Sequence, residues 1–311
     1  MKVLVFGVTG FAGAHLTAAL RAAGHDVCGA ARDPAAAPAA VETRAADIRS
    51  RSDVEAVLGH FAPDAVINLA GLASSPAAHR DPAAAFDTHA LGAVHLMEAI
   101  SAAGASTRVL IVTSSELYGT VDEGGLPLVE DAALRPTTIY AASKAAADLA
   151  VRSFAKAKGI DVVGVRPFNH TGPGQRTDFV CPDFASQVAE IAAGRREPRI
   201  EVGNIDIVRD FSDVRDIARG YVAALERGRS GEVYNLCSGR GISIRSMLED
   251  LCEIGGVAPE IRVAEERWRP AEVPAYWGSP AKAVRELEWQ TEIPWRRTLE
   301  DLYAVFAETA A

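Results

Sequence analysis

The chain has 311 residues, of which 49% are hydrophobic and 23% are charged. This composition is typical of a globular protein and excludes a disordered or collagen-like chain. The chain has 32 lysines and arginines and 41 aspartates and glutamates, which gives a net charge of −9. Such an acidic balance argues against a general binder of nucleic acid or of anionic membranes. The length predicts one large domain or two modest ones.

A cytoplasmic location is expected from three features of the sequence. No apolar run reaches the roughly 18 residues of a membrane-spanning helix. Residues 1–7 lack the basic start, long apolar stretch and cleavage site of a signal peptide. The four cysteines form no CxxC pair and have no histidine at metal-ligand spacing, so we expect reduced thiols and no metal site. They are Cys28, Cys181, Cys237 and Cys252.

The first half of the chain alternates strand and helix patterns. Apolar strands are predicted at 3–6, 26–31, 65–69, 109–113 and 162–165, and helices at 11–23, 53–60, 82–103 and 140–158. Continuous apolar strands separated by helices predict a parallel sheet that is covered on both faces. With right-handed crossovers, the fold class is α/β with a Rossmann-type doubly wound sheet.

The second half of the chain is less regular. A loop rich in proline, glycine, asparagine and threonine is predicted at 167–176. Helices follow near 179–194, 213–227, 243–254 and 298–307, and strands near 199–202 and 232–236. We predict a cofactor domain of residues 1–166 plus about 205–235. A smaller, discontinuous substrate domain is predicted for residues 167–204 plus about 236–311.

A glycine motif, GxxGxxG, lies between the first predicted strand and the first predicted helix. Its glycines are Gly7, Gly10 and Gly13. They permit a tight turn, a close backbone approach to a pyrophosphate, and close packing of the helix on the strand. The free N–H groups and dipole of the helix start favour an anion. We therefore predict a dinucleotide site here, with contacts from Thr9 and Phe11.

The second strand bears on the choice of cofactor. NAD sites usually carry an acid at the end of this strand, which bonds the ribose 2′-hydroxyl. Here the strand runs through Ala31 into Arg32, whose guanidinium suits a 2′-phosphate. This favours NADP(H), while a contact of Asp33 with the ribose of NAD stays the alternative. Further cofactor contacts are expected from Asp47, Ile48, Leu69, Ala70 and Gly71.

A Tyr-x-x-x-Lys motif places Tyr140 and Lys144 on one face of a predicted helix. Ser114 ends a preceding strand. A free phenol has a pKa of about 10, and we expect the ammonium of Lys144 and the nicotinamide charge to lower that of Tyr140. Tyr140 would then exchange a proton with a substrate oxygen. Lys144 would also hold the nicotinamide ribose, and Ser114 would bond the reacting oxygen.

In this order, the motifs resemble the extended short-chain dehydrogenases/reductases that act on nucleotide sugars. The resemblance covers nearly the whole chain and includes Ser114, Tyr140, Lys144 and the segments 209–216 and 269–282. The runs 166–175 and 202–204 are more specific. They resemble the GDP-4-dehydro-6-deoxy-D-mannose reductases, which make GDP-D-rhamnose. Relatives of these include GDP-mannose 4,6-dehydratases and UDP-hexose 4-epimerases.

The resemblance implies roles for residues of the second half. Asn169 would bond the diphosphate or the sugar, and Arg209 and Arg269 would pair with the diphosphate. The remaining implied contacts are Pro167 with the cofactor, and Ser115, Glu116, Val180, Pro182 and Phe184 with the substrate. The resemblance also implies a homodimer through helices 82–103 and 140–158. Burial of these helices in a monomer core is the competing interpretation.

The reaction predicted is NADPH-dependent reduction of the C4 ketone of a GDP-4-keto-6-deoxyhexose, with Tyr140 protonating the alkoxide. Glu116 keeps a 4,6-dehydratase open as an alternative, because it is placed to act as a base. The missing acid near Ala31 disfavours an NAD-dependent 4-epimerase. A non-catalytic NADP-binding protein is the other class considered. His89 stands where relatives usually have asparagine. His170 lies in a loop rich in glycine and proline, where a histidine is more often structural than catalytic.

Overall fold

The computed structural model describes residues 1–104, 106–121, 124–264 and 273–310. Its centre is a seven-stranded parallel sheet in the order β11-β6-β5-β4-β1-β2-β3. The strands are β1 (Lys2–Phe6), β2 (Asp26–Ala31), β3 (Glu42–Ala45), β4 (Ala65–Asn68), β5 (Arg108–Val112), β6 (Val162–Pro167) and β11 (Val233–Leu236). The order runs outward from β1 in both directions, which confirms the predicted doubly wound sheet.

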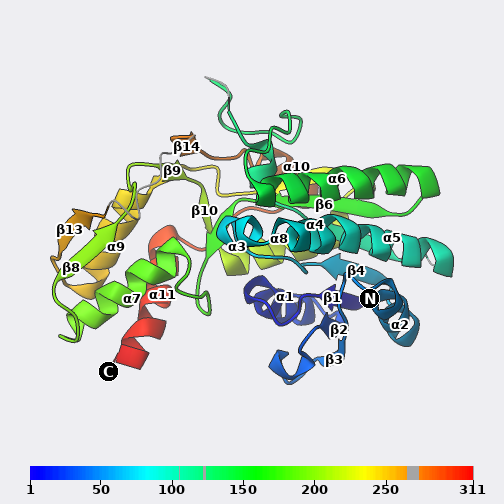
Figure 1. Ribbon diagram of the computed structural model, residues 1–311, viewed down its shortest axis with the longest axis horizontal. Helices are drawn as coiled ribbons and strands as arrows, with labels where there is room; N and C mark the ends of the chain where they lie inside the picture. Colours follow the sequence, from blue (N-terminus) through cyan, green and yellow to red (C-terminus); the bar gives the residue numbers. More distant parts are fainter. Residues whose placement is uncertain (105, 122–123, 265–272, 311) are drawn as a thin grey trace.

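Helices cover both faces of this sheet (Figure 1). On one face lie α1 (Phe11–Ala22), α8 (Val214–Arg227) and α10 (Ala281–Leu287), whose apolar side chains share one core with the sheet. On the other face lie α2 (Arg51–Phe61), α5 (Gly92–Ala103) and α6 (Ile139–Lys158). Each core is formed by alternate residues of the strands, because successive strand side chains point to opposite faces.

The helix predicted over 82–103 is interrupted, which corrects the sequence prediction. The structure has α4 (Pro82–Phe86), a π-helical turn η2 (Asp87–Leu91) and then α5. A further helix, α3 (Ser75–Arg80), precedes them. A π turn keeps a helical backbone and only adds a residue to one turn. Apolar spacing therefore does not distinguish it from a continuous helix.

A third core lies in the C-terminal part of the chain. It is formed by α7 (Val180–Ala192), α9 (Ile244–Gly255), α11 (Trp295–Ala310) and β8 (Arg199–Val202). Strand β13 (Glu260–Val263) pairs with β8 in parallel. These elements gather at the left of Figure 1, and the large sheet lies at the right. The boundaries of the two predicted domains stay a prediction.

Short strands connect the two parts and were not predicted individually. They are β7 (Asn169–Thr171), β9 (Val208–Arg209), β10 (Phe211–Asp213), β12 (Ile242–Ser243) and β14 (Ala275–Tyr276). β10 pairs with β7, and β9 lies between β12 and β14. The buried carboxylate of Asp210 accepts hydrogen bonds from the backbone of Ser238, Gly239 and Gly278. These bonds hold β9 and β10 in place beside the site described next.

In the part of the chain that the structure describes, no helix combines the length and apolar character needed to cross a membrane. The four cysteines are free thiols, and Cys28, Cys181 and Cys237 are buried.

Candidate active site

The glycine turn at the start of α1 is shaped by backbone contacts. Gly7 has φ of +83°, a conformation that favours glycine. A Cβ on Gly13 would lie 2.3 Å from the carbonyl oxygen of Gly7, and one on Gly7 would lie 3.0 Å from the nitrogen of Ala70. The turn therefore packs directly against the loop after β4. Thr9 and Gly10 are exposed and Phe11 is half-buried at the helix start. The first N–H groups of a helix have no partner within the helix and favour an anion.

The predicted adenosine end lies beyond β2. Arg32 is exposed there, whereas the Asp33 carboxylate accepts a hydrogen bond from the Ala35 N–H at 3.1 Å. Asp47 pairs with Arg49, with 2.6 Å between Oδ2 and Nη2. Its pKa is lowered by Arg49 first, and Arg32 adds to the shift. The side chain of Ile48 is buried in the core under α5.

Ser114, Tyr140 and Lys144 are brought together from two segments. Ser114 follows β5, and its Oγ accepts a hydrogen bond from the Glu116 N–H at 3.1 Å. Tyr140 lies in the first turn of α6, and the neighbouring side chain of Ser114 acts to lower the pKa of its hydroxyl. Lys144 is one turn further along, and its Nζ donates to the Val112 carbonyl at 3.3 Å. Their mutual placement supports the predicted proton-transfer role.

In the protein alone, the pKa of Tyr140 is shifted in the direction opposite to that predicted for the site with a bound nicotinamide. Burial and the nearby carboxylate of Glu116 raise it above its ordinary value, and the neighbouring Ser114 side chain offsets only part of this rise. The Lys144 ammonium lies 6.0 Å from the ring centroid of Tyr140. Burial lowers the pKa of Lys144 to about 8. In the protein alone Tyr140 is thus held as a protonated phenol, which suits an acid more than a base.

Glu116 sits among the predicted substrate residues. The Ser75 hydroxyl donates to its Oε2 at 3.4 Å. The residue as a whole is exposed, yet protein atoms crowd the carboxylate and strip part of its hydration, which raises its pKa. Arg209 acts in the opposite direction through its charge. Glu116 therefore lies within electrostatic reach of both Tyr140 and Arg209.

Arg209 comes from β9 and is half-buried. Its Nη1 donates to the Val208 carbonyl at 2.8 Å. Burial lowers its pKa, and the charges of Tyr276 and Glu116 act against that shift. An ion pair of Arg209 with a neighbouring aspartate was one interpretation of the sequence. Asp213 instead pairs with Arg215 at 2.7 Å, and Asp210 accepts from backbone N–H groups.

Tyr276 is a site residue that sequence reasoning missed. Its hydroxyl donates a hydrogen bond to the backbone carbonyl of Ser115. Ser115 is a buried residue. β14 pairs with β9, which puts Tyr276 opposite Arg209 in the strand register. It thereby joins the turn after β5 to the strand that carries Arg209. Its only signal in the sequence was its place in the segment 269–282.

The other predicted substrate residues are more scattered. Asn169 lies in β7, opposite Phe211 of β10, and directly follows the buried pair Pro167 and Phe168. In the first turns of α7, Val180 is half-buried while Pro182 and Phe184 are buried. Phe184 packs within the C-terminal core, so its side chain is occupied by core contacts. Arg269 lies outside the described residues.

His170 connects the predicted cofactor and substrate segments. Its ring stacks on Phe11, with centroids 6.2 Å apart and planes at 7°. Its Nδ1 lies 2.9 Å from the Phe168 carbonyl, which can only accept, so this nitrogen donates. Burial lowers the pKa of His170. These contacts favour the structural interpretation of this residue.

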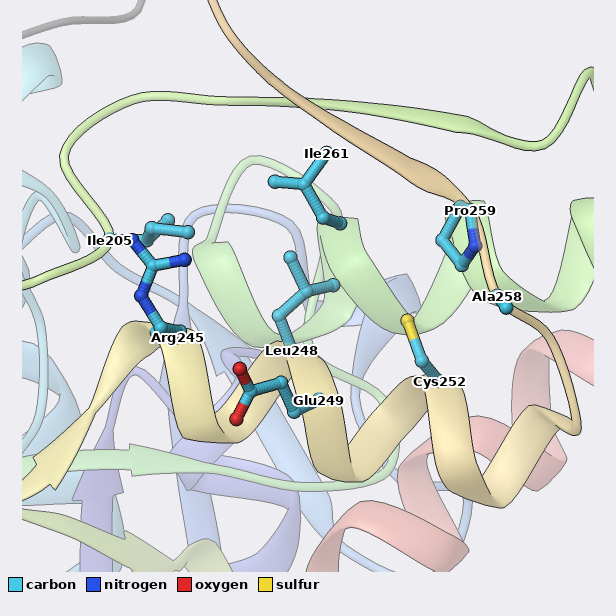
Figure 2. A pocket seen from close by; sticks show the side chains of 8 residues that line it. All are labelled: Ile205, Arg245, Leu248, Glu249, Cys252, Ala258, Pro259 and Ile261. Carbon is cyan, nitrogen blue, oxygen red and sulfur yellow. The ribbon is translucent and has the colours of Figure 1, made fainter.

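A separate open pocket lies between α9 and β13, and Figure 2 shows its lining. The lining residues are Ile205, Arg245, Leu248, Glu249, Cys252, Ala258, Pro259 and Ile261. At its edge, Arg245 pairs with Asp206 at 2.7 Å. None of the predicted site residues lines this pocket.

The fold and the Ser–Tyr–Lys arrangement define a dinucleotide-dependent oxidoreductase of the short-chain dehydrogenase/reductase class. The family model described as GDP-mannose 4,6 dehydratase matches residues 4–302 of this chain. The chain belongs to this family of extended short-chain dehydrogenases/reductases.

Individual relatives agree with this assignment. GDP-6-deoxy-D-mannose reductase of Pseudomonas aeruginosa is 38% identical over 299 residues, which cover 96% of this chain and 94% of the relative. The structure of RMD from Pseudomonas aeruginosa complexed with NADPH matches with a TM-score of 0.89 and 35% identity over 99% of both chains. Thermus thermophilus UDP-glucose 4-epimerase in complex with NAD matches with a TM-score of 0.88 and 26% identity, over 98% of this chain and 99% of that one.

Proposed function

We propose that this protein uses NADPH to reduce the C4 ketone of a GDP-4-keto-6-deoxyhexose, converting GDP-4-dehydro-6-deoxy-D-mannose to GDP-D-rhamnose. The observation that carries the proposal is the 38% identity with a GDP-6-deoxy-D-mannose reductase over 96% of the chain. The Ser114, Tyr140 and Lys144 arrangement supports it, because these groups suit proton delivery to a substrate oxygen.

In the mechanism, the chain's own residues orient the ketone and supply the proton. Bound NADPH supplies the hydride that reaches C4. Ser114 and Tyr140 donate hydrogen bonds to the C4 oxygen and polarise the carbonyl before transfer. Tyr140, whose raised pKa keeps it protonated, then gives its proton to the alkoxide. The phenolate formed is stabilised by the Lys144 ammonium and regains a proton from solvent.

NADP(H) is the proposed cofactor, and two features of the residues after β2 support it. The Asp33 carboxylate already accepts a backbone N–H from Ala35, so it is engaged within the chain. Arg32 is exposed and suits a 2′-phosphate. The similar structure from Pseudomonas aeruginosa holds NADPH, whereas the similar epimerase structure holds NAD.

A 4,6-dehydratase is the second candidate function, and Glu116 is the observation that favours it. Its carboxylate lies beside Ser75 and within electrostatic reach of Tyr140. A carboxylate with a raised pKa is a better proton acceptor near neutral pH. An NAD-dependent epimerase has no comparable support among the described residues near Ala31, where Asp33 is engaged as above.

We propose a homodimer and a cytoplasmic location. The proposed interface is formed by the helices of residues 82–103 (α4, η2 and α5) and by α6, on which three large apolar residues are exposed: Phe86, Leu91 and Leu149. These side chains are 38%, 50% and 51% exposed, and large exposed apolar residues on adjoining helices are typical of an interface. Size-exclusion chromatography with light scattering tests the dimer. A monomeric wild-type protein would refute the dimer, and a dimer that persists in Leu91→Glu would refute this interface. The location rests on the free thiols.

The decisive experiment supplies two substrates separately to the purified protein. With GDP-4-keto-6-deoxymannose and NADPH, the reductase proposal predicts loss of the NADPH absorbance and formation of a GDP-6-deoxyhexose. With GDP-mannose and either oxidised cofactor, the dehydratase candidate predicts a 4-keto product. Turnover of GDP-mannose alone would replace the first proposal by the second. Turnover of neither would support a non-catalytic NADP-binding protein.

A further inference from the structure

His89 is a buried histidine to which neither proposed reaction assigns a chemical step. It lies in the π-helical turn η2 and is 3% exposed. π turns often occur at functional sites, because they re-aim a side chain out of a regular helix. Here the turn packs against α6. The imidazole stands edge-on to the ring of Tyr140, with centroids 5.5 Å apart and planes at 89°.

Both nitrogens of His89 are engaged, and the hydrogen bonds have a definite direction. The Leu72 N–H can only donate, so Nε2 accepts it, at 3.0 Å. In the neutral ring, Nδ1 then carries the proton and donates to the hydroxyl of Ser143 at 2.7 Å. The Ser143 hydroxyl in turn donates to the backbone carbonyl of Tyr140 at 2.8 Å. One chain of bonds thus runs from the loop after β4 to the first turn of α6.

The ring stays neutral in its surroundings. Burial lowers the pKa of His89 to about 3, and the charge of Lys144 acts in the same direction. Protonation of Nε2 would also break the bond from Leu72, since both groups would then be donors. His89 is therefore not a proton donor near neutral pH, and its contribution is geometric.

The loop after β4 lies close to the ring at Gly71. A Cβ on Gly71 would lie 2.8 Å from Nε2 of His89 and 3.5 Å from Nζ of Lys144. The same loop packs against the glycine turn through Ala70. His89 is consequently the side chain that joins the predicted cofactor loop to the helix that carries Tyr140 and Lys144.

We propose that His89 is a positioning residue that sets the distance between the cofactor loop 69–72 and Tyr140, and hence between the bound nicotinamide and the proton donor. This inference rests on the proposed oxidoreductase function for its kinetic consequence. The part of the inference that concerns the hydrogen bonds of His89 and the distance between loop and helix does not depend on that function. Transfer steps are sensitive to placement, and an error of about 1 Å can cost a hundredfold in rate.

The first test is spectroscopic and needs no turnover. Long-range ¹H–¹⁵N spectra of the imidazoles, with His89 assigned by its loss in His89→Asn, report the tautomer of the ring. We expect a neutral ring with the proton on Nδ1 between pH 6 and 8, and slow exchange of the Leu72 amide. A protonated ring, or a proton on Nε2, would overturn the proposal.

The second test is kinetic. His89→Phe keeps a ring but removes both bonds, and we expect kcat to fall by about ten- to a hundredfold with little change in KM for the sugar nucleotide. His89→Asn retains one donor and one acceptor and should recover part of the loss. Ser143→Ala breaks only the second bond and should lose less than His89→Phe. His95→Phe, on α5, is the matched control and should behave as wild type.

The outcomes separate the two proposals. If His89→Phe turns over within about twofold of wild type and the Leu72 amide exchanges at an unchanged rate, His89 does not position the site. If His89→Phe does not fold, His89→Asn and Ser143→Ala carry the same comparison. If the wild-type protein does not reduce the ketone, the proposed function fails, while the imidazole and amide measurements still decide the role of His89.

Discussion

The two ends of the candidate site are built by different means. The cofactor end is made largely of backbone, with Gly7 and Gly13 letting a turn, a helix start and the loop after β4 meet closely. The substrate end is made of side chains from distant segments, among them Glu116, Arg209 and Tyr276. Carboxylates behave oppositely at the two ends, because Arg49 lowers the pKa of Asp47 whereas lost hydration raises that of Glu116.

This difference teaches where each kind of substitution acts. Where backbone segments meet closely, any added side-chain atom disturbs them. Substitutions at the cofactor end are therefore expected to lower cofactor affinity and the free energy of unfolding. The substrate end depends on individual polar side chains. Loss of one polar group there is expected to lower kcat or to change its pH dependence. Four substitutions separate the two modes.

The largest effect is expected for Tyr140→Phe. Loss of the proton donor should lower kcat for ketone reduction by about 10²- to 10⁴-fold, while binding of NADPH and of GDP stays near wild type. Stopped-flow turnover and a fluorescence titration of NADPH measure the two quantities. Tyr303→Phe on α11 is the matched control. Near-normal turnover in Tyr140→Phe would remove Tyr140 from the mechanism.

Gly13→Ala is expected to damage the cofactor end as a whole. The added Cβ would lie 2.3 Å from the Gly7 carbonyl oxygen, so the turn must shift. We expect a loss of about 1–3 kcal/mol in the free energy of unfolding together with weaker NADPH binding. Gly59→Ala in α2, where a Cβ meets no atom within 4 Å, should be neutral or stabilising. Chemical denaturation of both variants makes the comparison, and equal stability would contradict it.

Arg32→Ala tests the adenosine end. If the guanidinium binds the 2′-phosphate, its loss should weaken NADPH about tenfold or more, since a bond between charged groups contributes roughly 1.5–3 kcal/mol. Binding of NADH should change little. Calorimetric Kd values for both cofactors measure the effect, with the exposed Arg195→Ala as a charge-matched control. An equal loss for both cofactors would be evidence against a 2′-phosphate contact.

The smallest effect is expected for Glu116→Gln. The carboxylate raises the pKa of Tyr140, so its removal should lower that pKa. Reduction requires protonated Tyr140 and is lost as the pH rises through this pKa. The alkaline limb of the kcat profile should therefore move to lower pH, by roughly one unit or less. Glu308→Gln, exposed on α11, is the control. An unchanged alkaline limb in Glu116→Gln would show that Glu116 does not influence the pKa of Tyr140.

Complete loss of activity in Glu116→Gln would have a different meaning. It would indicate a direct chemical step at this carboxylate, as the dehydratase candidate requires. The same variant therefore distinguishes an electrostatic role at the substrate end from a proton-accepting one.

The sequence by itself determined the elements that depend on local patterns. Strand β2 (Asp26–Ala31) and strand β8 (Arg199–Val202) were predicted at their observed bounds, because apolar runs between turn residues are local signals. The parallel sheet followed from the alternation of such runs with helices. The glycine turn and the Tyr140–Lys144 spacing were also readable, since each needs only neighbours in one segment.

Only the tertiary structure decided how the side chains act on one another. In the protein alone the pKa of Tyr140 is raised and not lowered, because other segments bury its ring and place the charge of Glu116 nearby. The tertiary structure also revealed the hydroxyl of Tyr276 on Ser115 and the chain of bonds through His89. Periodicity records which residues are apolar. It carries no information on which buried polar groups meet, and that depends on packing between segments far apart in the chain.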